Sequence, residues 1–494
     1  MAGVFNGMTH PSTRRFGLKG AVLLLGTFLS ACVLTEPLDT GENRSFTNNW
    51  MKPDDPRSEI GKREHPLVLA KYGGEFRDPK AESLIAGIVG RLVAVSEDKT
   101  QLYRITILNS PKVNAFALPG GYLYVTRGLL SLANDSAELA GVIAHEMAHV
   151  SSNHAILRSE KENSIKVGSE VVSKVLGNNV AGRVAEAANQ LRLSEFSKDQ
   201  ELQADAVGIR MLGSAGFDSH GSVRFLETMQ AYQALMSQAD RRFGDFSFLS
   251  SHPATPQRID QAKRHARTFG APGTGETDRQ AYLNGIDGLL YGDSAEEGFV
   301  RNNTFSHLGL GVTFAAPANR RMENQATAVV ITGPDNLATR FDAAVLPRGQ
   351  SLAGYLKSGW VKGLDEASIT EGTVGGLPAA RAEADGSNWH FVIRLLQVDR
   401  QVYRFITAGP SGSGAIEAES NAIAGSFRRM TEAEKEALKP LEVKVVTVGA
   451  SDTLASLAAR MKGTPSPLRS FQVLNGLSAG QLPQPGSRVK IVTD

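Results

Sequence analysis

The five residues His145-Glu146-Met147-Ala148-His149 constrain the chain more than any other feature of its sequence. The residues before them predict a helix, because Asp135 can cap its start and Leu139, Val142 and Ile143 follow at helical spacing. Positions i and i+4 of a helix share one face, so both imidazoles can bind one zinc ion. A buried Glu146 between them suits a base that takes a proton from zinc-bound water. The alternative is a buried helix with incidental histidines.

A third metal ligand is expected from a second helix. Ser197 and Gln200 form a capping-box pattern, and the helix that they start is expected to end at Gly213. It carries Glu201 and Asp205 four residues apart, on one face. Glu201 can complete a site of two histidines and one glutamate, and Asp205 can hydrogen-bond the far nitrogen of a ligand histidine. Without the first helix, the two acids would be interpreted as a solvated acidic face.

Histidine spacing argues against a third histidine ligand close to the first two. The residue ten positions after His145 is Ala155, and a serine occupies position 152, where that pattern requires glycine. The nearby His154 is one position away from the expected place. We interpret it as structural.

The N-terminal segment predicts export and lipidation. Three basic residues precede an apolar run over 21–31 that is too short to span a bilayer, and Cys32 follows directly. This arrangement resembles a bacterial lipobox, which implies that residues 1–31 are a signal peptide and that lipid on Cys32 anchors the protein in the outer membrane, facing the periplasm. The alternative is an ordinary secretory signal with a chance cysteine. Export by the Sec or the twin-arginine route is left open.

Composition excludes several other classes of protein. Cys32 is the one cysteine in the sequence, so an internal disulfide framework, a Cys-rich zinc finger and an iron–sulfur site are excluded. The 53 basic and 51 acidic residues nearly balance, which indicates no basic surface for nucleic acid.

Changes in composition and in hydrophobic pattern along the chain predict a multidomain α+β protein. The expected units are a tether over 32–65, a mainly helical domain with one strand region over 66–269, a linker over 270–298, a sheet-rich domain of unknown role over 299–430, a charged linker over 431–440 and a small unit over 441–494.

From about Tyr72 to Ala262 the chain resembles the HtpX-like and CAAX-prenyl-protease-like zinc metallopeptidases, in their soluble periplasmic BepA-type lipoprotein form. The matching segments are 114–121, 138–149, 201–205, and Ser251-His252-Pro253 followed by Arg258. The resemblance implies a gluzincin fold with one zinc ion per chain, held by His145, His149 and Glu201, and Glu146 as the catalytic base. It also implies His252 as an inhibitory fourth ligand and Arg258 as a contact to substrate or to the oxyanion.

The strand region beside this site is a candidate binding surface for an extended peptide. The alternative is a core hairpin whose glycines make the turn. The candidate substrate-binding residues are Asn114, Ala115, Phe116, Ala117, Leu118, Pro119, Gly120 and Gly121.

The two C-terminal units carry no catalytic pattern. Residues 443–492 resemble a LysM module, although Ser451 replaces its usual glycine. This implies that the unit either binds peptidoglycan or serves as a small βααβ docking unit. The domain over 299–430 resembles a PsbP/Mog-like sandwich.

These features together predict an outer-membrane zinc endopeptidase that acts in the periplasm, and the family resemblance implies misfolded or stalled envelope proteins as its substrates. One alternative is a holdase or assembly factor with a largely latent zinc site. A second is a tether protein whose C-terminal unit binds peptidoglycan.

Overall fold

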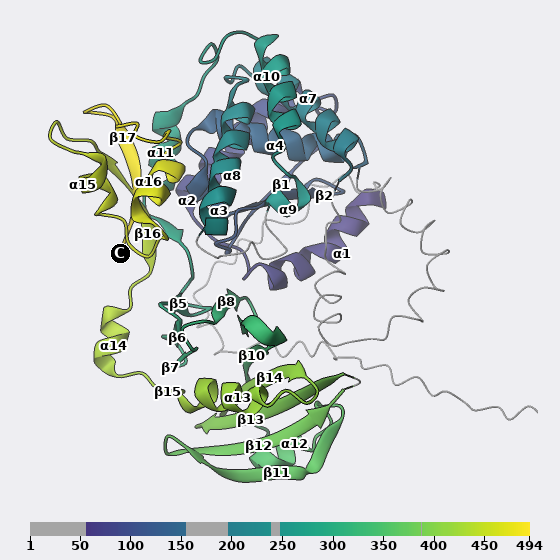
Figure 1. Cartoon of the computed structure of the whole chain (residues 1–494). Coiled ribbons are helices and arrows are strands. Elements are labelled where there is room, and N and C mark those ends of the chain that lie inside the picture. The colour runs from purple at the N-terminus through teal and green to yellow at the C-terminus, as the bar shows by residue number, and fades with distance from the viewer. Residues whose placement is uncertain (1–55, 155–195, 239–247, 387) are drawn as a thin grey trace, which may run out of the picture.

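The computed structural model describes residues 56–154, 196–238, 248–386 and 388–494 (Figure 1). The predicted signal peptide, Cys32 and residues 32–55 of the expected tether lie outside this part of the chain. The protein is a mixed α+β structure with a helical domain, a sheet-rich domain and a small C-terminal unit that lies against the helical domain (Figure 1). Within the described ranges, every helix is too short or too polar to cross a membrane.

The helical domain surrounds a small sheet of three strands. The strand order is β1-β3-β2, with β1 parallel to β3 and β2 antiparallel to it. The strands are β1 (Arg104–Leu108), β2 (Ala115–Leu118) and β3 (Tyr122–Thr126). The helices are α1 (Pro56–Lys71), α2 (Pro79–Val95), α3 (Arg127–Leu132), α4 (Ser136–Ser151), α7 (Lys198–Ser214), α8 (Gly221–Gln238), α9 (Phe248–Ser251), α10 (Pro256–Arg267) and α11 (Arg279–Ile286).

Helix α1 begins earlier than the sequence suggests. The tether was expected to reach residue 65, but the helix starts at Pro56 and continues through Pro66. Long-range contacts explain the difference. The ring of His65 lies against Tyr122 and Tyr124, and its Nδ1 is 2.8 Å from the hydroxyl of Tyr124.

Helices α4 and α7 form the centre of this domain, and both start where the sequence predicts. The side chain of Asp135 accepts a hydrogen bond from the backbone N–H of Glu138, and Ser197 forms a complete capping box with Gln200. Nearly every residue of α4 is buried. The two helices approach closely at Gly208 of α7, where a Cβ atom would lie 3.0 Å from the backbone nitrogen of His145.

The sheet-rich domain packs two sheets against each other. The larger sheet has the order β11-β12-β13-β14-β10-β9-β8 and the smaller one β15-β7-β6-β5. Aromatic residues of both sheets, including Phe314 and Phe405, share one core. The elements are β5 (Phe299–Arg301), β6 (Thr304–His307), β7 (Val312–Ala315), β8 (Arg321–Gln325), β9 (Ala328–Thr332), the 3-10 helix η1 (Pro334–Asn336), β10 (Ala338–Val345), α12 (Leu352–Leu356), β11 (Leu364–Val374), β12 (Leu377–Asp385), β13 (Trp389–Val398), β14 (Gln401–Pro410), α13 (Ala415–Gly425) and β15 (Arg428–Arg429).

The C-terminal unit follows α14 (Glu432–Ala437) and has the order β16 (Leu441–Thr447), α15 (Leu454–Ala458), α16 (Pro467–Leu474) and β17 (Arg488–Thr493). This is a βααβ arrangement, and its LysM character stays a prediction. Strand β16 also pairs with β4 (Leu289–Tyr291), which lies in the segment expected to be a linker. The unit shares a hydrophobic core with the helical domain, since Phe471 and Leu139 belong to one buried cluster.

Candidate metal centre

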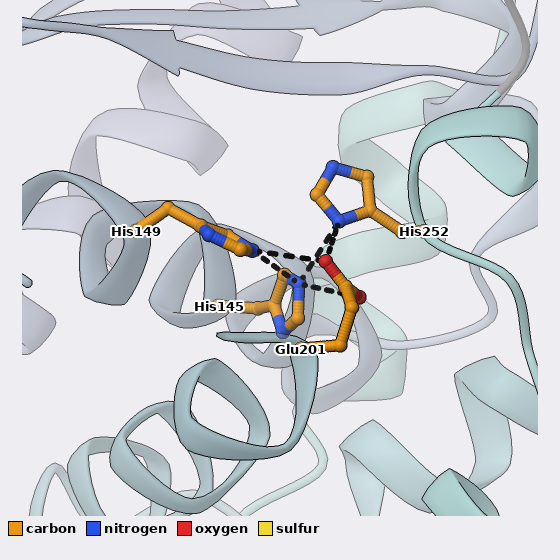
Figure 2. A group of neighbouring side chains, drawn as sticks. All are labelled: His145, His149, Glu201 and His252. Carbon is orange, nitrogen blue, oxygen red and sulfur yellow. Dashed lines mark hydrogen bonds and ion pairs between the residues drawn. The ribbon is translucent and has the colours of Figure 1, made fainter. Parts of the chain in front are cut away.

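Four buried side chains from three separate segments bring their polar atoms together (Figure 2). His145 and His149 lie on α4, Glu201 on α7, and His252 directly after α9. The Nε2 atom of His145 lies 3.1 Å from Nε2 of His149 and 3.2 Å from Nδ1 of His252. Oε1 of Glu201 lies 2.8 Å from Nδ1 of His252 and 3.3 Å from Nε2 of His149.

The four atoms lie within 4.8 Å of one another, and the distances given above compare well with those of a tetrahedral zinc site. Zinc–nitrogen bonds of 2.0–2.1 Å place neighbouring ligand atoms about 3.3–3.4 Å apart. The distances between the ring nitrogens and the carboxylate oxygen, 2.8–3.3 Å, are close to that value. A cation at the centre would also satisfy ring nitrogens whose lone pairs otherwise face each other. The donor set therefore fits a zinc ion.

The charges around the cluster favour a cation as well. Glu146, Glu201 and Asp205 are all buried there, with the guanidinium of Arg258 as the opposing charge. Burial acts to lower the pKa of His145, but Glu201 and Asp205 outweigh it and raise the pKa to about 10. The side chains of this pocket thus stabilise positive charge at the position of that ring.

Asp205 lies where the sequence analysis expected it, behind a ligand histidine. Its Oδ1 is 3.0 Å from Nδ1 of His145. Burial would raise the pKa of Asp205, but Arg258 and His145 outweigh it and hold the pKa at about 2. An ionised Asp205 favours the tautomer of His145 whose Nε2 is free to bind a metal.

Arg258 lies at the metal centre and contacts two of its acidic residues. Its Nε and Nη2 donate to the two carboxylate oxygens of Asp205 at 2.8 Å, and Nη1 lies 2.6 Å from Oε2 of Glu201. Nη1 also donates to the carbonyl oxygen of Pro253. All three guanidinium nitrogens therefore contact protein groups, and the contact with substrate or the oxyanion that the resemblance implies stays a prediction.

Glu146 lies on α4 between the two histidines and faces His252. Its Oε1 is 3.6 Å from Nε2 of His252, and neither atom has a hydrogen-bond partner in the described part of the chain. Burial raises the pKa of Glu146, which strengthens it as a base. His252 thus lies between the base and the other candidate ligands.

Two phenylalanines that the sequence analysis did not single out hold the ring planes. Phe248 stacks on His252 with ring centroids 4.6 Å apart, and Phe196 stacks on His149 at 3.8 Å. The backbone N–H of Phe248 donates to the carbonyl of Val113, which ties α9 to the start of β2. Aromatic residues are common in cores, so the sequence carried no signal for these roles.

The candidate substrate strand forms an edge of the three-stranded sheet. Residues 115–118 are β2, which pairs with β3 on one side and has no strand on the other within the described residues. Gly120 and Gly121 form the turn with φ of +88° and +86°, values that favour glycine. Phe116 points into a buried cluster with Tyr72 and Tyr124, so the strand also serves the core. Asn114 is buried and donates to the hydroxyl of Tyr72.

Comparisons with known proteins agree with this centre. Residues 78–266 match the family described as Peptidase family M48. The chain is 29% identical over 254 residues to the mitochondrial metalloendopeptidase OMA1 of Schizosaccharomyces pombe, which covers 51% of this chain and 72% of that protein. It is 24% identical over 269 residues to the beta-barrel assembly-enhancing protease of Yersinia pestis, covering 49% of this chain and 53% of that protein.

Comparison with solved structures gives weaker similarities. A solved structure of PsbP from Synechocystis covers 28% of this chain and 98% of its own, with 12% identity and a TM-score of 0.20. Similarity at this level supports no conclusion about the sheet-rich domain, whose PsbP-like character stays a prediction.

Proposed function

We propose that the chain is a zinc-dependent endopeptidase of the bacterial envelope, because residues 78–266 match Peptidase family M48 and contain a buried group of side chains that fits a zinc ion. The observation that carries this proposal is the convergence of His145, His149 and Glu201 on one point beside the buried carboxylate of Glu146. Two histidines and one glutamate are a ligand set of catalytic zinc, and a structural site has no use for an additional buried carboxylate.

Each residue of the cluster then has a separate task. His145, His149 and Glu201 would hold the metal through Nε2, Nε2 and a carboxylate oxygen. When bound, zinc would lower the pKa of a water molecule and polarise the peptide carbonyl. Glu146 would take the proton of that water and deliver it to the departing amine. Arg258 and Asp205 would keep His145 and Glu201 in place.

The open edge of β2 supports a substrate class. An extended peptide can add to an unpaired strand edge through backbone hydrogen bonds, with little dependence on its side chains. Folded proteins rarely offer such a segment, whereas unfolded chains do. We therefore propose misfolded or stalled envelope proteins as substrates, processed at the periplasmic face of the outer membrane by a protein that is anchored through lipidated Cys32.

A second candidate function is favoured by the position of His252. Its Nδ1 occupies the fourth corner of the donor set, where a catalytic zinc site keeps a water molecule. With His252 in place the enzyme would be latent, and binding of unfolded clients would be the main function. A separate proposal is that the C-terminal unit is a LysM-like module that binds peptidoglycan.

Cleavage of an unfolded protein distinguishes the two functions. Reduced casein is incubated with the zinc-loaded protein and with the variants Glu146→Gln, His252→Ala and, as a control, Glu97→Gln, whose side chain is 82% exposed. The peptidase proposal expects cleavage that is lost in Glu146→Gln, raised in His252→Ala and unchanged in Glu97→Gln. Bound zinc without cleavage, even in His252→Ala, would favour the holdase. Absence of bound zinc would contradict both.

A further inference from the structure

The two histidines of α4 differ in the group that contacts Nδ1, the ring nitrogen that points away from the metal centre. Nδ1 of His145 faces the carboxylate of Asp205. Nδ1 of His149 instead lies 2.9 Å from Nδ1 of another imidazole, His154, which is 1% exposed. A ligand histidine usually donates this hydrogen to a carboxylate, a backbone carbonyl or water. A buried imidazole in that place therefore requires an explanation.

The hydrogen bonds around His154 are consistent with one set of tautomers. Nε2 of His149 points into the metal centre and must be unprotonated there, so its Nδ1 carries the hydrogen. Nδ1 of His154 must then be the acceptor, which leaves the hydrogen of His154 on Nε2. That atom lies 3.2 Å from Oε1 of Gln203, an acceptor. Each donor in the series thus meets an acceptor.

The backbone explains how a residue five positions after His149 can reach it. On a continuing helix, position i+5 would lie about 140° around the axis from His149. Helix α4 ends at Ser151, and Asn153 has φ of +53°, in the left-handed region. This turn brings His154 back against His149. The stacked ring of Phe196 lies on the same imidazole.

The charge of the cluster is consistent with a neutral partner at this position. Glu146, Glu201 and Asp205 oppose one guanidinium, that of Arg258. With a divalent ion bound, these formal charges sum to zero. A second carboxylate behind His149 would leave an uncompensated buried charge, which is costly. A neutral imidazole supplies the acceptor without adding charge.

We infer that His154 is a positioning residue, which sets the tautomer and ring plane of His149 for the metal, and that Gln203 sets the tautomer of His154 in turn. This inference rests on the proposed zinc function. It assigns a role to a histidine that the sequence alone identifies only as structural.

Two substitutions distinguish the effect of the hydrogen-bond acceptor of His154 from the effect of its side-chain volume. His154→Asn keeps an oxygen acceptor near the place of Nδ1, whereas His154→Leu fills similar space without one. Zinc affinity of the full chain is measured by competition with a chromophoric chelator, and the visible absorption of the cobalt-substituted protein reports ligand geometry. The matched control is His220→Leu, which removes another buried histidine of the same domain.

We expect zinc affinity to fall about 10–100-fold in His154→Leu and to stay within about threefold of wild type in His154→Asn. Gln203→Leu should produce a smaller loss. Wild-type affinity and an unchanged cobalt spectrum in His154→Leu would overturn the inference. So would equal losses in the Leu and Asn variants that match the loss in His220→Leu. Failure of the wild type to bind zinc would instead contradict the proposed function, and zinc binding without hydrolysis would leave the inference testable.

Discussion

Arg258 shows how a single side chain can set the geometry of several others. Its paired contacts to Asp205 and its contact to Glu201 come from one rigid, planar group. Lysine offers one charged nitrogen and cannot reproduce the two parallel contacts. The position therefore depends on the shape of arginine as well as on its charge.

We expect Arg258→Leu to lower the free energy of unfolding by about 3–5 kcal/mol, because two buried carboxylates lose their charged partner. Arg258→Lys should keep part of this stability and bind zinc at least about tenfold more weakly, since Asp205 would no longer be held against His145. Urea denaturation and zinc titration measure the two effects. In the control Arg210→Leu the change should stay below about 0.5 kcal/mol, because that side chain is 57% exposed. A variant Arg258→Leu as stable as wild type would contradict this account.

Removal of the metal should destabilise the domain. Without zinc, the carboxylates of Glu146, Glu201 and Asp205 are opposed only by Arg258 and by the ring of His145, whose pKa is raised to about 10, in place of a divalent ion. We expect a chelator to lower Tm by several degrees, and zinc at 100 times its Kd to restore about 2.7 kcal/mol of stability. Differential scanning calorimetry of the wild type and of Glu201→Ala measures this. An equal response in both proteins would place the stabilising zinc at another site.

At the scale of elements, helices α4 and α7 were the most predictable parts of the structure. Local signals define them, since Asp135 and Ser197 cap their starts and the spacing of His145 to His149 depends only on helical periodicity. The ligands on these helices therefore follow from sequence. His252 lies directly after a helix of four residues, and its place was suggested by family resemblance alone.

Elements made by long-range contacts could not be predicted in this way. Strand β4 has three residues and forms because β16, far along the chain, pairs with it. Residues 56–65 looked like a polar tether but are part of helix α1, and His65 at the end of this stretch packs against Tyr122 and Tyr124. Neither segment has a periodic sequence pattern, because contacts with its partner, and not its own residues, stabilise its secondary structure.

The contact between α4 and α7 gives a prediction about the close packing of two elements. Gly208→Val should push the helices apart, because its Cβ would lie 3.0–3.2 Å from backbone atoms of Ala144 and His145. We expect a loss of at least about 1–3 kcal/mol in stability, together with weaker zinc binding, since Glu201 would move relative to His145. Thermal unfolding and zinc titration test both effects.

Gly87→Ala on helix α2 is the matched control for this substitution. Apart from the adjacent residues and the local helix backbone, no atom lies within 4 Å of the Cβ that it adds, so it should be neutral or stabilise by up to about 1 kcal/mol. If Gly208→Val bound zinc as tightly as Gly87→Ala, the helix contact would not control the geometry of the site.

At the scale of the whole molecule, the parts are joined by specific polar contacts. The fully buried Arg127 of the helical domain donates to the carbonyls of Leu290 and Gly292, at and just after β4. Lys112, just before β2, forms a 2.9 Å ion pair with Glu323 of the sheet-rich domain. In Figure 1 the C-terminal unit lies beside α8 and α11. Polar contacts therefore join the helical domain both to the segment around β4 and to the sheet-rich domain.

Lys490 of β17 joins the C-terminal unit to the helical domain through buried hydrogen bonds. Its side chain is 1% exposed, and Nζ donates to the carbonyl oxygens of Ser131, Leu132 and Ala133 at 2.6–3.1 Å. These carbonyls end α3 and immediately precede the segment that caps α4. A lysine in a strand ordinarily indicates an exposed position, so this contact could not be predicted from the sequence.

We expect Lys490→Met to lower the free energy of unfolding by about 2–4 kcal/mol, because buried carbonyls at the end of α3 lose their donor. The control Lys462→Met, in the same unit but 55% exposed, should change it by less than about 0.5 kcal/mol. Removal of residues 441–494 should have a larger effect, since it uncovers core residues shared with the helical domain. Calorimetry should show one cooperative transition that is shifted to lower temperature in Lys490→Met and in the truncated chain and nearly unchanged in Lys462→Met. A separate low-temperature transition, with the Tm of the helical domain unchanged, would instead show that the C-terminal unit is an independent module.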